Sequence, residues 1–584
     1  MVLSGGTSGG GGSTITQQLA KNAYLTLDQT FDRKAKELFL AIEIEKKYSK
    51  EEILTMYLNN AYFGNGVWGV QDASRKYFGV DATNVTLSEA ATLAGMLKGP
   101  GIYNPIDHPE NANDRKNTVL SVMEENGKIT KEQEQAESQT DISAYLHDTY
   151  DNSDSGYRYP YYFDAVIDEA VNEYGLDEED VMNKGYKIYT ALDQDYQKQL
   201  EATYQNNALF PANASDGAMV QSASVALDPN TGGVQALVGR RGDHVFRGFS
   251  FATQMRRSPG STIKPLSVYT PALEAGYKPS SVLKDEPQSY YDAHNFDGTY
   301  QGEVPMYQAV AQSLNLPAVW LLHEIGLQKG YDKAEEFGLP LAKSDKYYGL
   351  ALGGLEKGVS PMIMAGAYSA FANEGQMYTP HLITKIVDST GAVIIDNTNK
   401  KPKQVISKET ADEMTSMLLG TFSNGTAAAA NPAGYTIAGK TGTTETNFDA
   451  TKANDQWMIG YTPDVVISTW MGFEESSKLH YLEGTSGNVV GKVFKSAAEG
   501  ILPYTSKTGF SVADAYATGG QVVAADQVGN TGNSNGESGN WQDNLNQYGE
   551  QAKEGLKNFG DMVKEGVQGI GEAAKDLWRK YQGE

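Results

Sequence analysis

The chain has 584 residues, 40% of them hydrophobic, and contains no cysteine. This length predicts two or three domains, and the lack of cysteine excludes disulfides, thiolate metal sites and a cysteine nucleophile. The formal net charge of −25 argues against nucleic-acid binding, because phosphate neutralisation requires a basic surface.

The first half of the chain is predicted to be helical and then mixed. Apolar residues recur at helical spacing over 31–130, with one helix expected at 87–98. Residues 135–160 are acidic and polar and are predicted to form a linker. Residues 160–200 are expected to be a small mixed segment that includes a strand at 186–192.

Strand and helix signals alternate between residues 220 and 503. Residues 222–227 and 234–238 flank an Asp-Pro-Asn-Thr-Gly turn and are predicted to form a β-hairpin. Two further strands are expected at 457–461 and 465–471. Strands on both sides of a helical middle predict an α/β layer fold with an antiparallel sheet.

The C-terminal part has a different composition. Residues 504–540 are rich in Gly, Asn, Ser and Ala and are predicted to be a flexible linker. Residues 549–581 repeat an 11-residue pattern, which predicts a helix with one apolar face. Two interpretations stay open for this tail, namely a helix lying on the membrane or wall surface and a solvated segment.

No run of about 20 apolar residues occurs, so no membrane-spanning helix is predicted. The first twelve residues have neither the basic region nor the apolar run of a signal peptide. The seven histidines are scattered without metal-ligand spacing, and no metal site is predicted from them.

Three short motifs follow one another in a fixed order. They are Ser261-Thr262-Ile263-Lys264, Ser313-Leu314-Asn315 and Lys440-Thr441-Gly442-Thr443. A serine hydroxyl needs a base to become a nucleophile, and residues three apart on a helix share a face. A neutral lysine amine could therefore reach the Ser261 hydroxyl. The ordered set is the signature of serine enzymes that form an acyl-enzyme.

Each motif also has a simpler explanation when taken alone. Ser261 could merely cap a helix, Ser313 and Asn315 could be ordinary loop polarity, and Lys440 could be exposed on an edge strand. In the functional interpretation, Ser313 and Asn315 point the same way in an extended or loop segment. There they relay a proton and hold a carbonyl. Gly442 leaves room for the substrate backbone, and Lys440 and Thr443 hold a carboxylate.

The segments RSPGSTIKP, SLNLPAVWL and GKTGTT resemble the transpeptidase domain of class A penicillin-binding proteins. The resemblance implies that Ser261 is the nucleophile, that Lys264 is its base, and that transpeptidation needs no cofactor. It implies further catalytic roles for Ser313, Asn315 and Lys440, and a substrate-binding strand of Thr441, Gly442 and Thr443. The N–H groups of Ser261 and Thr443 would form the oxyanion hole. The implied donor is a stem peptide ending in D-Ala-D-Ala, and β-lactams would acylate Ser261.

The N-terminal segments GGSTITQQLAKN from residue 11, RKAKE from 33, 53–70 and 87–95 resemble the second to fifth motifs of the glycosyltransferase domain of the same proteins. That domain polymerises lipid II, which requires a base and groups that hold the leaving pyrophosphate. Glu37 is the candidate base or orienting residue, and a divalent cation could take part. The candidate substrate-binding residues are Ser13, Thr14, Gln17, Gln18, Lys21, Arg33 and Lys34. Without its neighbours, the charged cluster could equally be a solvated helix face.

In the family, the principal catalytic glutamate lies in a first motif upstream of GGSTITQQ, after a membrane helix. Residues 1–10 contain no acidic residue, so the chain is expected to be N-terminally truncated. A natural variant with an inactive glycosyltransferase is the alternative. The resemblance implies a Gram-positive bacterium, the outer face of the cell membrane, and lipid II and nascent peptidoglycan as partners.

The expected fold is multidomain, with a mainly α, lysozyme-like glycosyltransferase domain and an α/β transpeptidase domain of the penicillin-binding/β-lactamase type. The predicted divisions are 1–130 glycosyltransferase, 131–215 linker region, 216–503 transpeptidase, 504–540 flexible linker and 541–584 helical tail. A β-lactamase or soluble carboxypeptidase would not explain the glycosyltransferase motifs. A non-catalytic penicillin sensor or scaffold is the alternative function.

Overall fold

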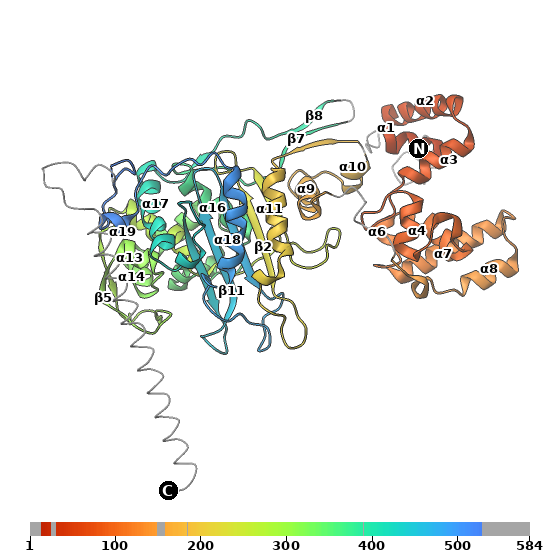
Figure 1. Ribbon diagram of the computed structural model, residues 1–584. Coiled ribbons are helices and arrows are strands. Elements are labelled where there is room, and N and C mark those ends of the chain that lie inside the picture. Colours follow the sequence, from red (N-terminus) through yellow and green to blue (C-terminus); the bar gives the residue numbers. More distant parts are fainter. Residues whose placement is uncertain (1–12, 25–30, 149–157, 184, 389–390, 528–584) are drawn as a thin grey trace, which may run out of the picture. The chain divides into compact units, whose positions relative to one another are not determined.

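The computed structural model describes residues 13–24, 31–148, 158–183, 185–388 and 391–527 (Figure 1). The chain divides into two compact units, Met1–Ala525 and Asp526–Glu584. The predicted helical tail at 541–584 lies outside the described residues, so its prediction is untested. Within the described ranges, no helix combines the length and the apolarity needed to cross a membrane.

The N-terminal region is helical, as the apolar periodicity predicts. Capping boxes begin three of its helices, where Ser49 pairs with Glu52, Thr86 with Glu89 and Thr130 with Gln133. The helix expected at 87–98 is confirmed as α5. The helices are α1 (Ile15–Tyr24), α2 (Phe31–Lys47), α3 (Lys50–Asn60), α4 (Val70–Phe78), α5 (Leu87–Met96), α6 (Pro100–Tyr103), α7 (Pro109–Glu125) and α8 (Lys131–Ser138).

Most of the predicted linker region 131–215 is folded, which corrects that prediction. It contains α8, α9 (Pro160–Asn172), α10 (Glu178–Asn183), β1 (Lys187–Thr190) and α11 (Gln194–Gln205). The strand expected at 186–192 is confirmed as β1. Helix α9 buries Tyr162, Ala165 and Ile167 in the main core of the C-terminal region. Helix α9 falls within residues 160–200, which were expected to form a small mixed segment.

A five-stranded antiparallel sheet forms the centre of the C-terminal region, in the order β10-β11-β12-β2-β3. The hairpin and the two later strands predicted from the sequence are therefore confirmed. The strands are β2 (Gln221–Leu227), β3 (Val234–Val238), β10 (Ala438–Glu445), β11 (Ala453–Tyr461) and β12 (Val466–Gly472). Every residue of β2 and β12 is buried, as expected for strands covered on both faces.

Helices cover both faces of this sheet. Helices α11 and α18 (Val490–Ile501) pack together over one face, in a core that includes Leu200, Ile467 and Phe494 (Figure 1). Helix α16 (Pro361–Ala372) packs against β2, β11 and β12 in a separate core. The predicted α/β layer architecture with an antiparallel sheet is confirmed.

Further helices surround the second face of the sheet. They are α12 (Thr270–Glu274), α13 (Met306–Ala311), α14 (Leu316–Ile325), α15 (Leu327–Glu336), α17 (Lys408–Ser423) and α19 (Ala515–Thr518). Three small sheets complete the region, β1-β7-β8, β4-β5 and β6-β9. Their other strands are β4 (Val282–Asp285), β5 (Gly302–Pro305), β6 (Gln376–Met377), β7 (Ile383–Val387), β8 (Val393–Asp396) and β9 (Lys403–Gln404).

The flexible linker predicted at 504–540 begins too early. Ala515 in α19 is fully buried in the main core, and the Ser416 hydroxyl on α17 donates a hydrogen bond to the Ala513 carbonyl at 2.7 Å. Glycine and alanine are typical of linkers, but the part of this segment that forms α19 packs on α17.

Candidate active site

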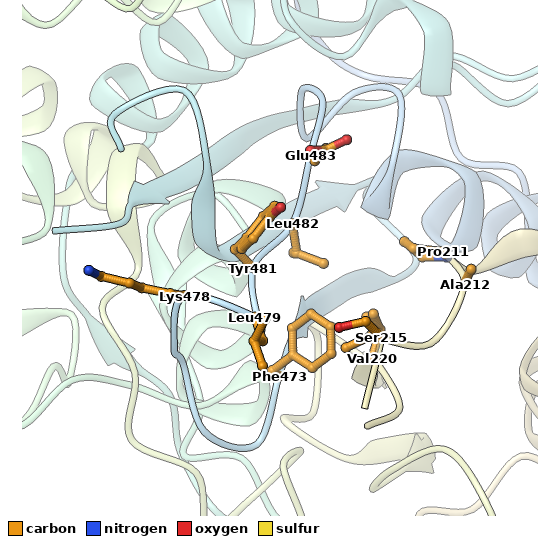
Figure 2. Close-up of a pocket in the computed structure, with 11 residues that line it drawn as sticks. Pro211, Ala212, Ser215, Val220, Phe473, Lys478, Leu479, Tyr481, Leu482 and Glu483 are labelled. Atoms are coloured by element: carbon orange, nitrogen blue, oxygen red, sulfur yellow. The ribbon is translucent and has the colours of Figure 1, made fainter. Parts of the chain in front are cut away.

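One cleft of about 310 Å³ brings the three sequence motifs together. Ser261, Ser313, Asn315 and residues 441–443 all line it. A larger cavity of about 390 Å³ lies elsewhere, between the 211–220 segment and the loop after β12 (Figure 2). Its walls are both apolar and polar, with Phe473, Leu482, Lys478 and Glu483 among them, and it contains no motif residue. The chemistry therefore belongs to the smaller cleft.

Ser261 and Lys264 lie at the start of one helical segment, as predicted. The segment begins as a 3₁₀-helix, η5 (Gly260–Ile263), and continues through the π-helix η6 (Pro265–Tyr269) into α12. Side chains three residues apart are eclipsed in a 3₁₀-helix. Lys264 follows this 3₁₀-helix directly, three residues after Ser261.

Lys264 is fully buried, and its amine has three acceptors. Nζ donates to the Ser313 carbonyl at 2.7 Å, the Leu314 carbonyl at 2.9 Å and Asn315 Oδ1 at 2.7 Å. Burial, and then repulsion from Lys440, lower the pKa of Lys264 well below its ordinary value. The acceptors favour the ammonium form, but complete burial outweighs them because the charge has lost its water.

Lys440 is also fully buried, and burial lowers its pKa to about 7. Its amine donates to the Thr441 carbonyl at 3.3 Å. The β10 wall of the cleft consists of Thr441, Gly442 and Thr443, and Lys440 does not line it. The predicted contact between Lys440 and a substrate carboxylate stays a prediction. From its position, Lys440 acts on the charge of Lys264.

Ser313 has a left-handed backbone with φ +58°, where glycine is usual. The N–H of Leu314 donates to the Ala309 carbonyl at 3.1 Å, and that of Ser313 to the Val310 carbonyl at 3.2 Å. These two bonds form a Schellman motif at the end of α13. The turn directs the Ser313 and Leu314 carbonyls at Lys264. The motif is thus a turn, and the predicted extended alternative is wrong.

Replacing Ser313 with glycine is expected to stabilise the fold and impair the reaction. A left-handed L-residue costs about 1–2 kcal/mol, which glycine avoids, while the hydroxyl that lines the cleft is lost. We expect a higher melting temperature and a roughly hundredfold slower acylation by penicillin. Ser313→Ala is the matched control, because it loses the hydroxyl but keeps the backbone cost. Unchanged acylation in both variants would contradict a role for the hydroxyl.

Two buried residues that the sequence analysis missed hold Asn315 in place. Asn295 Oδ1 accepts from the N–H groups of Asn315, at 2.8 Å, and Leu316, at 3.2 Å. Its amide donates to Asp285 Oδ1 at 2.7 Å, and both residues line the cleft. Neither residue lies within a recognisable motif, so only their meeting in the fold identifies them.

Gly442 is required by a contact different from the predicted one. A Cβ at this position would lie 2.5 Å from the Pro259 carbonyl oxygen and 2.9 Å from Thr262 Cγ2. The missing side chain therefore allows β10 to approach the segment that carries Ser261. The prediction assigned this space to the substrate backbone.

Hydroxyl pairs fix the two threonines of β10. Thr441 Oγ1 lies 2.6 Å from Thr426 Oγ1, and Thr443 Oγ1 lies 2.6 Å from Ser486 Oγ. Ser486 donates to the Gly442 carbonyl at 2.7 Å, so Thr443 supplies the proton of its pair with Ser486. Thr443 must redirect that proton to bind a carboxylate. The polar turns that carry Thr426 and Ser486 gave no signal in the sequence.

The candidate glycosyltransferase residues lie on α1 and α2, which pack together, and on the two residues before α1. Thr14 and Gln17 bond reciprocally, through Thr14 N to Gln17 Oε1 at 2.9 Å and Gln17 N to Thr14 Oγ1 at 3.2 Å. Gln18 donates to the Ser13 carbonyl at 3.3 Å and accepts from the Tyr57 hydroxyl. These contacts stabilise the start of α1, so the polar residues of the motif have a structural role.

Glu37 is buried on α2, with 1% of its surface exposed. The side chains of Lys21, Arg33 and Lys34 lie outside what the structure describes, so their predicted role stays a prediction. Among the described residues, no group of three or more His, Asp or Glu side chains is placed to hold a metal ion.

Both main regions of the chain resemble known proteins. The transglycosylase family model matches residues 2–124, and the penicillin-binding protein transpeptidase domain matches residues 222–499. Penicillin-binding protein 2a of Streptococcus pneumoniae is 54% identical over 530 residues, which cover 90% of this chain and 72% of that protein. The chain belongs to the class A penicillin-binding proteins. It therefore acts in peptidoglycan synthesis, with a glycosyltransferase and a transpeptidase domain, and it binds β-lactams.

Other class A penicillin-binding proteins and solved structures agree with this assignment. Penicillin-binding protein 1F of Bacillus subtilis is 41% identical, over 87% of this chain and 69% of its own length. The structure of PonA1 from Mycobacterium tuberculosis matches with a TM-score of 0.52 and 26% identity, over 61% of this chain and 95% of that one. Penicillin-binding protein 1A of Haemophilus influenzae shares the fold, with a TM-score of 0.52 and 21% identity over 85% of this chain and 89% of its own.

Proposed function

We propose that Ser261 carries the acyl group in D,D-transpeptidation. Its oxygen attacks the carbonyl between the two terminal D-alanines of a stem peptide, and an ester bond forms as the peptide C–N bond breaks. The Ser261 proton passes through Lys264 to the departing D-alanine. An amine of a neighbouring peptide then attacks the ester and releases Ser261. The observation that carries this proposal is the meeting of all three motifs around one cleft, with the fully buried Lys264 three residues after Ser261.

The charge state of Lys264 supports its role as the base. A neutral amine has two N–H bonds, so it satisfies two of its three acceptors and keeps a lone pair for the Ser261 hydroxyl. Burial and the nearby Lys440 favour this neutral form. The N–H groups of Ser261 and Thr443 would bind the oxyanion that forms on the attacked carbonyl.

Labelling with a fluorescent penicillin tests this assignment directly. We expect Ser261→Ala to lose covalent labelling completely, because no other residue of the cleft would carry the ester. The intact mass of the wild type should rise by one penicillin, and peptide mapping should place the added mass on Ser261. Ser267→Ala, at a buried serine of the same helical segment, is the control and should still label. Labelling of Ser261→Ala at the wild-type rate would refute the proposal.

We infer that Glu37 serves the glycosyltransferase domain as a base or orienting group. Its burial on α2, beside the motif on α1, supports this role. We expect Glu37→Gln to lower lipid II polymerisation at least about a hundredfold in the presence of penicillin, which silences Ser261. Glu43→Gln, on the exposed face of α2, is the matched control. Equal polymer from wild type and Glu37→Gln on a gel would exclude the role.

A divalent cation in the glycosyltransferase domain stays a prediction. The described side chains offer no cluster that fits one, so no step is assigned to a metal. Polymerisation assays with and without EDTA test the prediction, and an unchanged rate after chelation would remove it.

We propose that the chain works at the outer face of the cell membrane, where a lipid-linked sugar donor and the growing wall meet. The lipid-linked substrate of its glycosyltransferase family supports this location. Separation of membranes from cytosol, followed by penicillin labelling of each fraction, tests it. Recovery of the labelled chain in the cytosol alone would contradict it.

A further inference from the structure

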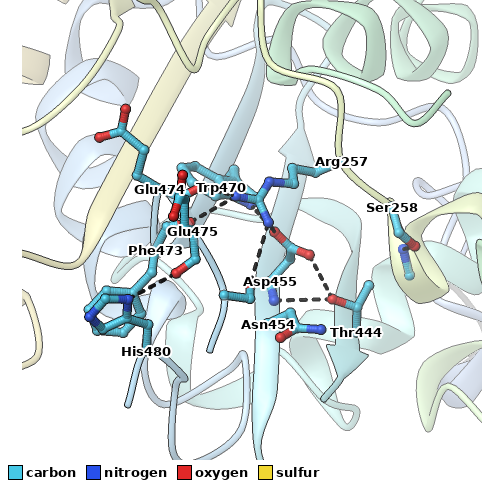
Figure 3. A network of polar contacts seen from close by, with 12 residues as sticks. Arg257, Ser258, Thr444, Asn454, Asp455, Trp470, Phe473, Glu474, Glu475 and His480 are labelled. Carbon is cyan, nitrogen blue, oxygen red and sulfur yellow. Dashed lines mark hydrogen bonds and ion pairs between the residues drawn. The ribbon is translucent and has the colours of Figure 1, made fainter. Parts of the chain in front are cut away.

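A buried carboxylate lies at the centre of a polar network that connects β10, β11 and the segment before Ser261 (Figure 3). Asp455 on β11 has 4% of its surface exposed. Its Oδ2 accepts a hydrogen bond from the Thr444 hydroxyl at 2.8 Å, and its Oδ1 accepts one from Trp470 Nε1 at 3.0 Å. The Asp455 N–H donates back to the Thr444 hydroxyl at 3.1 Å. Asp455 is thus hydrogen-bonded to β10 at Thr444, the residue after Thr443.

Arg257 connects the same carboxylate to the segment that leads to the nucleophile. Its Nη1 lies 3.9 Å from Asp455 Oδ1, and its Nη2 donates to the carbonyls of Phe473, at 3.0 Å, and Glu474 (Figure 3). Its backbone pairs with Val359 through two hydrogen bonds of 3.0 and 2.7 Å. Arg257 is therefore fixed at both ends, four residues before Ser261.

The turn between Arg257 and Ser261 has little freedom to move. The Ser258 carbonyl accepts from Trp457 Nε1 at 2.9 Å, and the Ser258 hydroxyl donates to the Gly353 carbonyl at 2.6 Å. At Gly260, a Cβ would lie 2.6 Å from the carbonyl oxygen of Thr443. The turn is thus in direct contact with the backbone of β10. A shift at Arg257 or at Thr444 would therefore change the spacing between Ser261 and Thr443.

We propose that Asp455 and Arg257 are positioning residues, which hold the N–H groups of Ser261 and Thr443 at the separation that the oxyanion needs. The inference rests on the proposed acyl transfer at Ser261. Neither residue lines the cleft, so both act through the two backbone segments that they connect. Burial raises the pKa of Asp455, and the Arg257 charge and the hydrogen bonds from Thr444 and Trp470 oppose that rise.

A comparison of two substrates on the same enzyme separates positioning from general stability. The first is a depsipeptide ester donor, and the second is the same donor with C=S in place of the attacked C=O. Sulfur accepts hydrogen bonds poorly, so a well-formed oxyanion hole favours the oxygen substrate. A loss of folded enzyme lowers both rates equally and cancels in the ratio of their kcat/KM values.

We expect Asp455→Asn to lower the ratio of kcat/KM for the oxygen substrate to kcat/KM for the sulfur substrate about tenfold. Loss of a single oxyanion-hole donor lowers kcat roughly 10²–10³-fold, and this variant should weaken the oxyanion hole only in part. Thr444→Val removes the link to β10 without changing the volume, and it should narrow the ratio as well. Glu169→Gln is the matched control. That carboxylate is also buried and accepts two backbone N–H bonds, but it lies away from the cleft, so the ratio should stay at the wild-type value.

The outcomes distinguish the two proposals. If the wild type forms no ester with the depsipeptide at Ser261, as judged from its mass, the proposed function fails. If the ester forms but Asp455→Asn and Thr444→Val keep the wild-type ratio, the positioning role alone is overturned. A narrowed ratio in both variants, with Glu169→Gln unchanged, supports it.

Discussion

Replacing Lys264 with methionine is expected to slow acylation by penicillin about 10³-fold. Methionine fills the space of the lysine stem but has no amine to accept the Ser261 proton, and general-base catalysis is worth about 10²–10⁴-fold. Stopped-flow or gel-based labelling with a fluorescent penicillin measures the rate. Lys198→Met, at a half-exposed lysine on α11, is the control and should label normally.

The pH dependence of the same reaction checks the reason for the loss. The pKa of Lys264 is lowered well below its ordinary value, so the fraction of neutral amine rises as the pH increases through that lowered pKa. Acylation by wild type should therefore increase with pH and level off below the usual lysine range. In Lys264→Met this increase should disappear. A wild-type rate that keeps rising to the ordinary lysine pKa would show that the amine is charged in the fold.

The change of Gly442 to alanine is expected to have the second large effect. The new Cβ would lie 2.5 Å from the Pro259 carbonyl, and both are backbone-anchored, so β10 must move away from the segment that carries Ser261. A displacement of about 1 Å at reacting groups can cost roughly a hundredfold in rate. We expect that loss in penicillin acylation, with a free energy of unfolding lower by about 1–3 kcal/mol.

Gly509→Ala is the matched control for this change. A Cβ at Gly509 meets nothing within 4 Å, so both acylation and thermal unfolding should match the wild type. If Gly442→Ala acylated as fast as Gly509→Ala, the close approach of β10 to Pro259 would not matter for the reaction.

The site was predictable from the sequence where the chemistry resides in short motifs. Ser261 lies in one short motif and Ser313 and Asn315 in another, and the cleft brings the two motifs together. The reason for Gly442 could not be predicted, because Pro259 reaches it from another part of the chain. The complete burial of Lys440 could not be predicted either, because it depends on the sheet behind it.

Elements with a simple periodicity were also predictable, and those with a misleading composition were not. The β2–β3 hairpin and α5 follow their apolar patterns. The apolar residues of α9 are interspersed with acidic residues, and α19 lies in a stretch whose composition is typical of a linker. Asn295 accepts a hydrogen bond from Asn315, which lies 20 positions away, and no local sequence pattern predicts such a contact.

The central pairing of β2 with β12 also determines when the newly synthesised protein can first react with penicillin. Ser224 and Thr469 are bonded across this pair although they stand 245 positions apart. Contacts of such long range form slowly, because a long loop must close before the pairing stabilises it. Ser261 emerges from the ribosome long before β10, β11 and β12 exist to complete its surroundings. Covalent labelling by penicillin therefore reports only the molecules that have finished folding. The time at which labelling begins measures the last step of folding.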